Sequence, residues 1–236
     1  MKKFIIVLIF TVSLIIPKAY TQETGTFTDS RDGKTYKTVK LGDQTWMAEN
    51  LKFWVDKKSP DYKGSSYFYK GENENYRLYG RLYDWKVACE SCPEGWHLPS
   101  VDEWKTMIIS FGDFYDENGQ IPANKQLSKE ERKRRKELFK EISKALAKGG
   151  SSGFDIDYGG YRDKNVYQGV NLSTMRSFYS GLGTVAKVWT ADAKINKGAI
   201  NAQVFHFQKT GKNSGAFAFG KWRKGINCSV RCVQDK

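Results

Sequence analysis

The 236-residue sequence has only two histidines, His97 and His206, and both lie between apolar residues. This setting favours a structural role for each imidazole. No Ser, His and Asp set occurs at a recognisable spacing, and no glycine-rich phosphate loop is present. The sequence therefore gives little basis for acid–base catalysis, and we expect neither a metal nor a cofactor.

Long apolar runs are absent after residue 21, so no later segment has the roughly 18 apolar residues that a membrane-spanning helix needs. The first 21 residues differ. Lys2 and Lys3 precede a short apolar run at 4–16, and small residues Ala19 and Thr21 suit a cleavage site. We predict a secretory signal peptide at 1–21, with a signal anchor as the alternative. The protein should then be periplasmic, at the outer cell surface or extracellular.

Acidic residues are too few to balance the basic ones, and the net charge is +13. Without residues 1–21 it is +10, and the segment 125–148 alone carries +6. Its acid-free run consists of Arg132, Lys133, Arg134, Arg135 and Lys136. This run is a candidate contact for an anionic polymer or membrane surface. The competing interpretation is a solvated helix face with local ion pairs. Sequence-specific nucleic-acid binding is not expected.

The first half of the chain carries local folding signals. Residues 22–30 are polar and are expected to form a loose leader before a domain at 31–236. Strand patterns at 34–40 and 45–48 predict a hairpin. Ser100 with Glu103, and Ser128 with Glu131, have capping-box spacing and predict helices starting there. The second helix should extend to Gly149 and form a basic insertion at about 125–148. A short helix or turn is expected at 79–89.

After residue 154 the chain becomes rich in glycine and aromatic residues, with short alternating runs that predict short strands. In the last run Cys228 and Cys232 should point to the same side. An extended chain holds them about 13 Å apart, which is too far for a disulfide. The two connectivities that join Cys89 and Cys92 to Cys228 and Cys232 remain open. A four-cysteine zinc site and a redox C-x-x-C are the alternatives, and export disfavours both.

Several segments resemble the Fibrobacter succinogenes major paralogous domain family. They are GDQTWMAENL (42–51), YGRLYDW (79–85), CPEGWHLPS with EW (92–100, 103–104), GGYR (159–162) and SVRCV (229–233). Their order and content are specific, and they cover about residues 30–235. The long basic helix, and the sequence VWTAD around Trp189, depart from the family pattern.

The resemblance implies an α+β, C-type-lectin-like fold with short, irregular antiparallel strands, two or three helices and long loops. It is shared with formylglycine-generating-enzyme-like domains. It also implies a Cys92–Cys232 disulfide, with Cys89–Cys228 as an extra pair beside it. The calcium-binding tripeptides of sugar-binding C-type lectins (Glu-Pro-Asn or Gln-Pro-Asp, with Trp-Asn-Asp) are absent. The family carries no known activity that would settle the function.

We expect a non-catalytic binding module for a glycan or a protein. Exposed aromatic rings beside polar groups suit such ligands. The candidate surface consists of Tyr161, Arg162, Asp163, Trp189 and Trp222. The competing interpretation is that these side chains serve packing. An enzyme related to formylglycine-generating-enzyme-like domains, and a binder of anionic surfaces, are the alternative functions.

Overall fold

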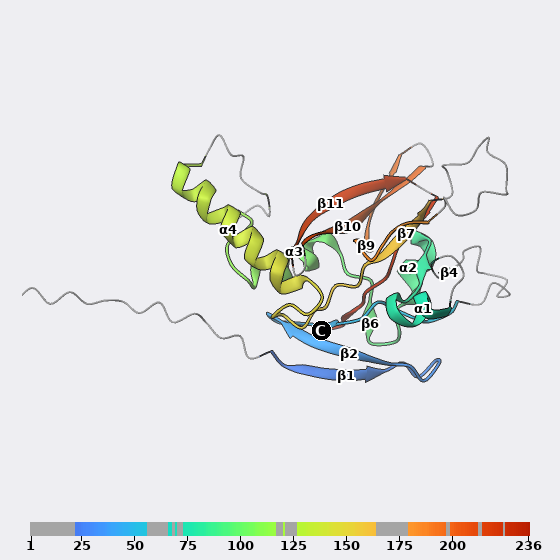
Figure 1. The fold of residues 1–236 in the computed structure, drawn as a ribbon. Helices are drawn as coiled ribbons and strands as arrows, with labels where there is room; N and C mark the ends of the chain where they lie inside the picture. Colours follow the sequence, from blue (N-terminus) through green and yellow to red (C-terminus); the bar gives the residue numbers. More distant parts are fainter. Residues whose placement is uncertain are drawn as a thin grey trace, which may run out of the picture.

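The computed structural model describes residues 22–55, 66–67, 69, 73–116, 120, 127–163, 179–196, 199–211, 214–223 and 225–236. These residues form an α+β structure with two large sheets and four helices (Figure 1). The predicted class is confirmed, although the expectation of two or three helices was too low. The predicted signal peptide lies outside the described residues. The helices are α1 (Asn73–Tyr79), α2 (Trp85–Ser91), α3 (Val101–Ile109) and α4 (Lys129–Leu146).

The first sheet joins the two ends of the described chain. Its strands, in spatial order, are β1 (Thr24–Thr28), β2 (Thr35–Leu41), β3 (Gln44–Met47), β13 (Val233–Gln234) and β6 (Trp96–His97). The predicted hairpin is confirmed by the antiparallel pairing of β2 with β3. The loose leader was wrong, because β1 pairs with β2 along its whole length. Its single apolar side chain, Phe27, packs against Trp96 with ring centroids 5.0 Å apart.

The second sheet consists mainly of a long antiparallel meander. Its order is β11 (Ser214–Arg223), β10 (Ala199–Gly211), β9 (Val185–Asn196), β7 (Gly159–Asp163) and β12 (Ile226–Asn227), with β8 (Tyr179–Leu182) pairing to β7. A small third sheet pairs β4 (Ser66–Tyr67) with β5 (Leu82–Tyr83). Strands β9, β10 and β11 are 10 to 13 residues long, so the predicted short strands were wrong here. The sheet is mixed, because Gly160 of β7 pairs in parallel with Ala186 of β9.

Alternation along the meander separates two faces. Phe205, Phe207 and Phe217 lie on the face that meets α3 and α4, and all three are buried in one core cluster. Trp104 of α3 stacks on Phe205 with centroids 4.1 Å apart. The opposite face of the meander carries Trp189, Ala202 and Val204, which belong to a second core cluster with Ile226 and Cys228. The two faces therefore have different neighbours.

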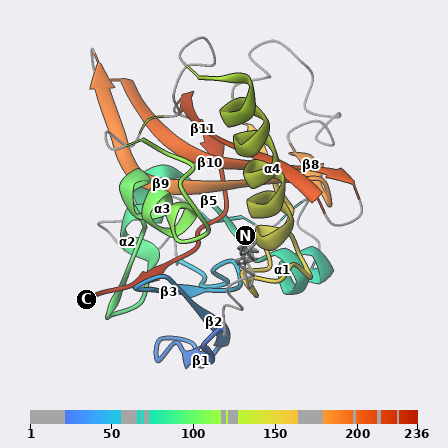
Figure 2. The same ribbon diagram turned by 90° about the vertical axis from the view of Figure 1, so that its left-hand side faces the viewer.

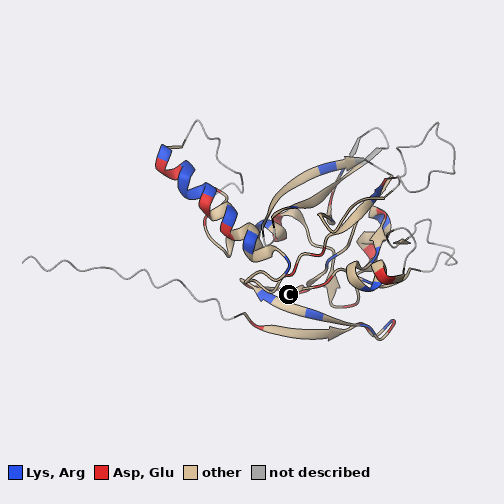
Figure 3. Cartoon of the chain, viewed as in Figure 1, with Lys and Arg blue, Asp and Glu red and all other residues tan. Residues whose placement is uncertain are grey.

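Both predicted capping boxes are present. Ser100 accepts from the backbone N–H of Glu103 at the start of α3, and Ser128 does so from Glu131 at the start of α4. Helix α4 packs its C-terminal half onto the meander and extends its N-terminal half away from it (Figures 1 and 2). Lys and Arg are concentrated along this helix (Figure 3). The expected helix or turn at 79–89 corresponds instead to the end of α1, strand β5 and most of α2.

Candidate ligand-binding site

The cysteines close the chain at one point only. Cys92 and Cys232 form a disulfide with an S–S distance of 2.08 Å and Cα atoms 5.9 Å apart. Cys89 and Cys228 are free thiols, so the predicted second disulfide is absent. Cys89 is exposed on α2, whereas Cys228 is fully buried in the core. The helix therefore turns Cys89 toward solvent, and the chain must leave α2 before Cys92 can reach the last strand.

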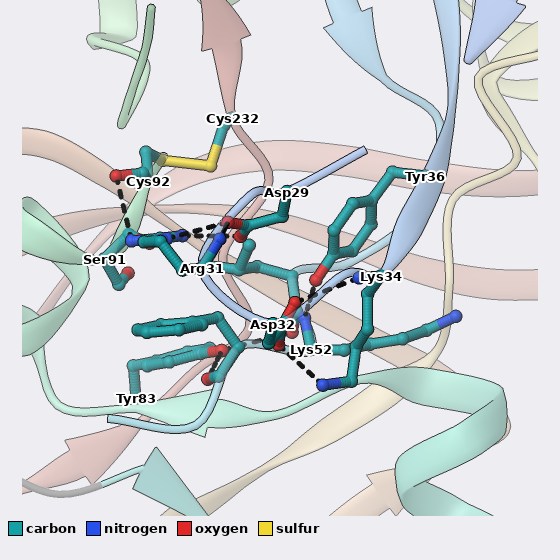
Figure 4. A network of polar contacts seen from close by, with 12 residues as sticks. Asp29, Arg31, Asp32, Lys34, Tyr36, Lys52, Tyr83, Ser91, Cys92 and Cys232 are labelled. Carbon is teal, nitrogen blue, oxygen red and sulfur yellow. Dashed lines mark hydrogen bonds and ion pairs between the residues drawn. A yellow bond between two sulfur atoms is a disulfide. The ribbon is translucent and has the colours of Figure 1, made fainter. Parts of the chain in front are cut away.

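A polar network fastens the N-terminal hairpin beside this disulfide (Figure 4). The guanidinium of Arg31 binds both carboxylate oxygens of Asp29, at 2.9 and 2.7 Å, and donates to the carbonyl of Ser91 at 2.9 Å. It also stacks on Phe53, with Cζ 3.8 Å from the ring centroid. Burial opposes ionisation of Asp29, but its bonds to Arg31 hold the pKa of this carboxyl below its ordinary value. The network is structural, because Arg31 uses its donors within the fold.

A second buried network surrounds Arg231, which is fully buried. Its guanidinium contacts the carboxylate of Asp157 at 3.3 Å, the side-chain oxygen of Asn50 at 3.3 Å and the carbonyl of Phe154. Asn50 in turn donates to Ser229 at 3.2 Å. Buried charges persist when they are paired and hydrogen-bonded in this way. Here they join the last strands to segments more than 70 residues earlier.

The most unusual arrangement lies on the other face of the meander. Lys187 of β9 is 2% exposed, and its ammonium nitrogen lies 3.3 Å from the ring centroid of Tyr161 and 3.2 Å from that of Trp222. The two rings are 5.9 Å apart and both remain partly exposed. Tyr161 comes from β7 and Trp222 from β11, so three strands build the cluster. We call Tyr161, Lys187 and Trp222 the aromatic–lysine cluster.

Electrostatics around this cluster are positive. Burial lowers the pKa of Lys187 to about 8, while Cys228 and Asp163 act in the opposite direction. His206 is the register partner of Lys187 on β10. Burial lowers the pKa of His206, and the Lys187 ammonium lowers it further. Within the described part of the chain, the Nε2 atom of His206 is buried without a hydrogen-bond partner.

Arg162 faces the other side of β7 from Tyr161, as strand alternation requires. Its Nη1 donates to the side-chain oxygen of Asn227 at 3.2 Å, and its Cζ lies 4.2 Å from the ring centroid of Tyr67. The same carbon lies 5.9 Å from the ring centroid of Tyr179. Strand β7 thus carries aromatic and cationic contacts on both of its faces.

Comparison with known families gives one match, to the Fibrobacter succinogenes major domain, over residues 39–234. The chain belongs to this family. Neither the curated proteins nor the solved structures contain a match to it. The motifs that carried the resemblance are mostly structural in this Fibrobacter succinogenes major domain. Asn50 and Arg231 share one buried network, Trp46 and Trp104 are core residues, and Cys92 and Cys232 form the disulfide.

The predicted ligand surface is only partly assembled. Tyr161 and Trp222 meet at the aromatic–lysine cluster, and Arg162 and Asp163 follow on the same strand. Trp189 does not belong to this surface, because it is 2% exposed and donates from Nε1 to the carbonyl of Tyr83 at 2.7 Å. Trp189 lies two positions after Lys187 on the same side of β9, and its ring is buried in a core cluster there. Tyr161, Asp163 and Trp222 therefore remain on this surface, whereas Arg162 faces the other side of β7.

A polar hollow in this family member lies near the C-terminus, and Asp43, Glu103 and Asp235 are among the residues that line it. His97 stands beside it with Nε2 2.7 Å from Glu103 and Nδ1 2.5 Å from Asp235. Partial burial opposes protonation, but the two carboxylates raise the pKa of His97 above its ordinary value. His97 is therefore half-exposed and paired rather than buried. No group of three or more metal-ligating side chains occurs among the described residues.

Sequence reasoning missed the central residue of the cluster. Lys187 sits in the run Val185–Val188, where an isolated lysine in a strand is ordinarily taken as solvent-facing. One weak signal was available. Lys187 and Trp189 are two positions apart in the strand, so they lie on the same face of it, and Trp189 is a core residue. The apolar neighbours of His206 predict a structural histidine. Its pairing with Lys187 depends on the register of β9 and β10, which the sequence does not reveal.

Proposed function

We propose that this chain is a secreted or cell-surface, non-catalytic module that binds a glycan on the face carrying Tyr161 and Trp222. The observation that supports it is the aromatic–lysine cluster. The ammonium between the two rings holds each ring in one orientation, so little side-chain entropy remains to be lost on binding. Rigid, partly exposed aromatic rings offer an apolar surface to sugar rings, and Asp163, two positions after Tyr161 on the same side of β7, offers a hydrogen-bond acceptor.

The test uses a glycan array probed with residues 22–236, followed by titration of the best hit. Trp222→Ala should weaken binding at least tenfold, because it removes one of the two rings. Trp54→Ala is the matched control, since Trp54 is 63% exposed and lies outside the cluster. Thermal unfolding of both variants checks that they fold. Loss of binding in Trp54→Ala with retention in Trp222→Ala would contradict the proposal, as would an array without any hit.

Secretion is part of this proposal. The apolar run at 4–16 supports a cleaved signal, and the Cys92–Cys232 disulfide suits an oxidising compartment. In the described part of the chain, the helices are all too short or too polar to cross a bilayer. Fractionation of producing cells, with N-terminal sequencing of the exported protein, should give a chain that begins at Gln22. A chain retained in the cytoplasm with Met1 intact would refute this.

We further propose that the fold is C-type-lectin-like. Its support is the return of the last strand, β13, into the sheet that holds β2 and β3, together with the disulfide at that point.

The alternative enzymatic function would need reactive thiols in the second half of the chain. Burial raises the pKa of the Cys228 thiol, and burial with Glu90 raises that of Cys89 to about 11, so both stay protonated at neutral pH.

A further inference from the structure

Helix α4 carries its cations in a single line on one face. At about 100° per residue, six of its basic side chains fall within an arc of about 120°. All six are exposed, and they extend over about 22 Å at 1.5 Å per residue. We call this set the basic stripe; it consists of Lys129, Arg132, Lys133, Lys136, Lys140 and Lys144.

The acids of α4 lie outside this arc, although one of them, Glu137, pairs with Lys140 of the stripe at 3.2 Å. Glu130, Glu131, Glu137 and Glu141 fall outside the arc by the same count. Arg134 and Arg135 also fall outside it. Arg134 pairs with Asp113 at 3.6 Å, and Arg135 donates to the backbone carbonyl of Phe114. Of the expected contact at 132–136, Arg132, Lys133 and Lys136 lie on the line, exposed Arg134 and half-buried Arg135 lie beside it, and Lys129, Lys140 and Lys144 extend it.

The apolar face of α4 is already occupied. Ile142 and Leu146 are buried in the core, and Phe139 stacks on Phe217 of β11 with centroids 4.7 Å apart. Helices that lie in a membrane surface insert an apolar face beside their cations. Here that face is covered by the protein's own sheet, and the basic stripe points away from it. What α4 offers to a partner is a row of charges without an apolar anchor.

The residue types of the stripe also limit the classes of anionic partner that fit it. Five of its six cations are lysines, which act as point charges, whereas arginine is the residue suited to bidentate recognition of phosphate. Along the helix axis the successive cations are spaced by about 1.5 to 6 Å, so the row can face a linear polymer that carries a charge on each unit. A carboxylated polysaccharide has this character. The stripe has no aromatic or amide side chain, so it lacks the base-stacking surfaces and adenine-reading amides of many nucleic-acid sites.

We propose that the basic stripe of α4 is a docking surface for a linear acidic polysaccharide. Binding here is independent of the aromatic–lysine cluster, because Phe217 and Trp222 are an odd number of positions apart on β11 and face opposite sides of it. Phe217 meets α4, whereas Trp222 meets Lys187. The interaction is driven by release of counterions from the polymer, so its affinity must fall steeply as salt rises.

The experiment compares residues 22–236 with two variants of equal net charge. The stripe variant carries Lys129→Gln, Lys133→Gln, Lys136→Gln and Lys140→Gln, which keep helix propensity. The control variant carries Lys86→Gln, Lys194→Gln, Lys221→Gln and Lys236→Gln, at exposed lysines outside α4. Binding to sodium polygalacturonate is titrated at several salt concentrations, and circular dichroism reports helix content.

We expect the wild-type chain and the control variant to bind alike, and the stripe variant to bind at least tenfold more weakly. The slope of log K against log salt should be shallower by about three units in the stripe variant. Equal loss in both variants would show a net-charge effect and overturn the proposal. Binding to phosphatidylglycerol vesicles or double-stranded DNA in place of polygalacturonate would also overturn it. Trp222→Ala should leave this binding unchanged, which separates it from the glycan site.

Discussion

At the scale of single residues, Lys187 shows how the fold accommodates a charge without a carboxylate partner. Its nitrogen has no hydrogen-bond or ion-pair partner among the described residues, and the two flanking rings provide the compensation. Each cation–π contact of a desolvated ammonium contributes about 2 kcal/mol. Removing such a charge from water costs several kcal/mol. The rings therefore offset part of the burial cost and leave an electropositive point under the surface.

This residue predicts an unusual pH dependence. Because the folded pKa of Lys187 lies near 8, below the unfolded value, the unfolded chain binds more protons between about pH 8 and 10.5. The destabilisation caused by Lys187 is complete below pH 8 and disappears as pH rises through this window. The free energy of unfolding of Lys187→Met minus that of the wild type should fall by about 2 kcal/mol from pH 7 to pH 10. Urea titrations measure it, and a pH-independent difference would contradict it.

At the scale of elements, the short strand β13 depends on contacts outside itself. It has two residues, pairs with β3 and β6, and is followed by the ion pair between Asp235 and His97 of β6. Two residues form too few ladder bonds to be stable alone. The His97 imidazolium therefore acts as a bridge between the end of the chain and Glu103 at the start of α3.

The bridge should weaken in alkaline solution. The pKa of His97 is raised in the folded state, so its stabilisation is complete below the ordinary value near 6.5 and is lost as pH rises through the raised value. Amide exchange at Asp235, whose N–H donates to the carbonyl of Gly95, should be less protected at pH 9 than at pH 5.5, after correction for intrinsic rates. His97→Gln should remove this pH effect. An unchanged effect in that variant would assign it to another group.

At the scale of the whole molecule, one covalent bond closes the larger part of the described chain, from Cys92 to Cys232. The disulfide joins residues separated by 140 positions. Loop-closure arguments give about 4–5 kcal/mol for a loop of this size, although native-state strain can reduce it. The disulfide lies where the N-terminal hairpin, α2 and the last strand meet. The Arg31 network and the Cys92–Cys232 bond therefore hold the same region together (Figure 4).

Two measurements check this arrangement. Cys92→Ser with Cys232→Ser should lower the free energy of unfolding by about 3–5 kcal/mol. Thiol titration without reductant should detect Cys89 slowly in the native protein, and Cys89 with Cys228 after unfolding, because only Cys89 is exposed. If no free thiol were detected in the unfolded protein, Cys89 and Cys228 would have to form a disulfide after all.

Sequence reasoning succeeded where the determining interactions are local. The two capping boxes lie within four residues, the hairpin is set by its turn, and the Cys92–Cys232 bond follows from family motifs. It failed where strand register decides. The burial of Trp189 and the environment of Lys187 depend on which strands become neighbours, and the fate of Cys89 depends on the direction in which α2 turns it. Strand β1 was missed because Thr24–Thr28 has only one apolar residue to indicate a buried side.

The position of β13 bears on the order in which the protein can be made. A ribosome releases β1, β2 and β3 first, yet the strand that lies between β3 and β6 emerges only after the whole meander. Cys232 and Arg231 arrive with it. A nascent chain that ends before residue 231 therefore has an open first sheet and an unpaired Cys92, and its Asp157 keeps Lys148 as an ion-pair partner but loses Arg231. A stop codon placed just before residue 231 should therefore be as damaging as one placed much earlier.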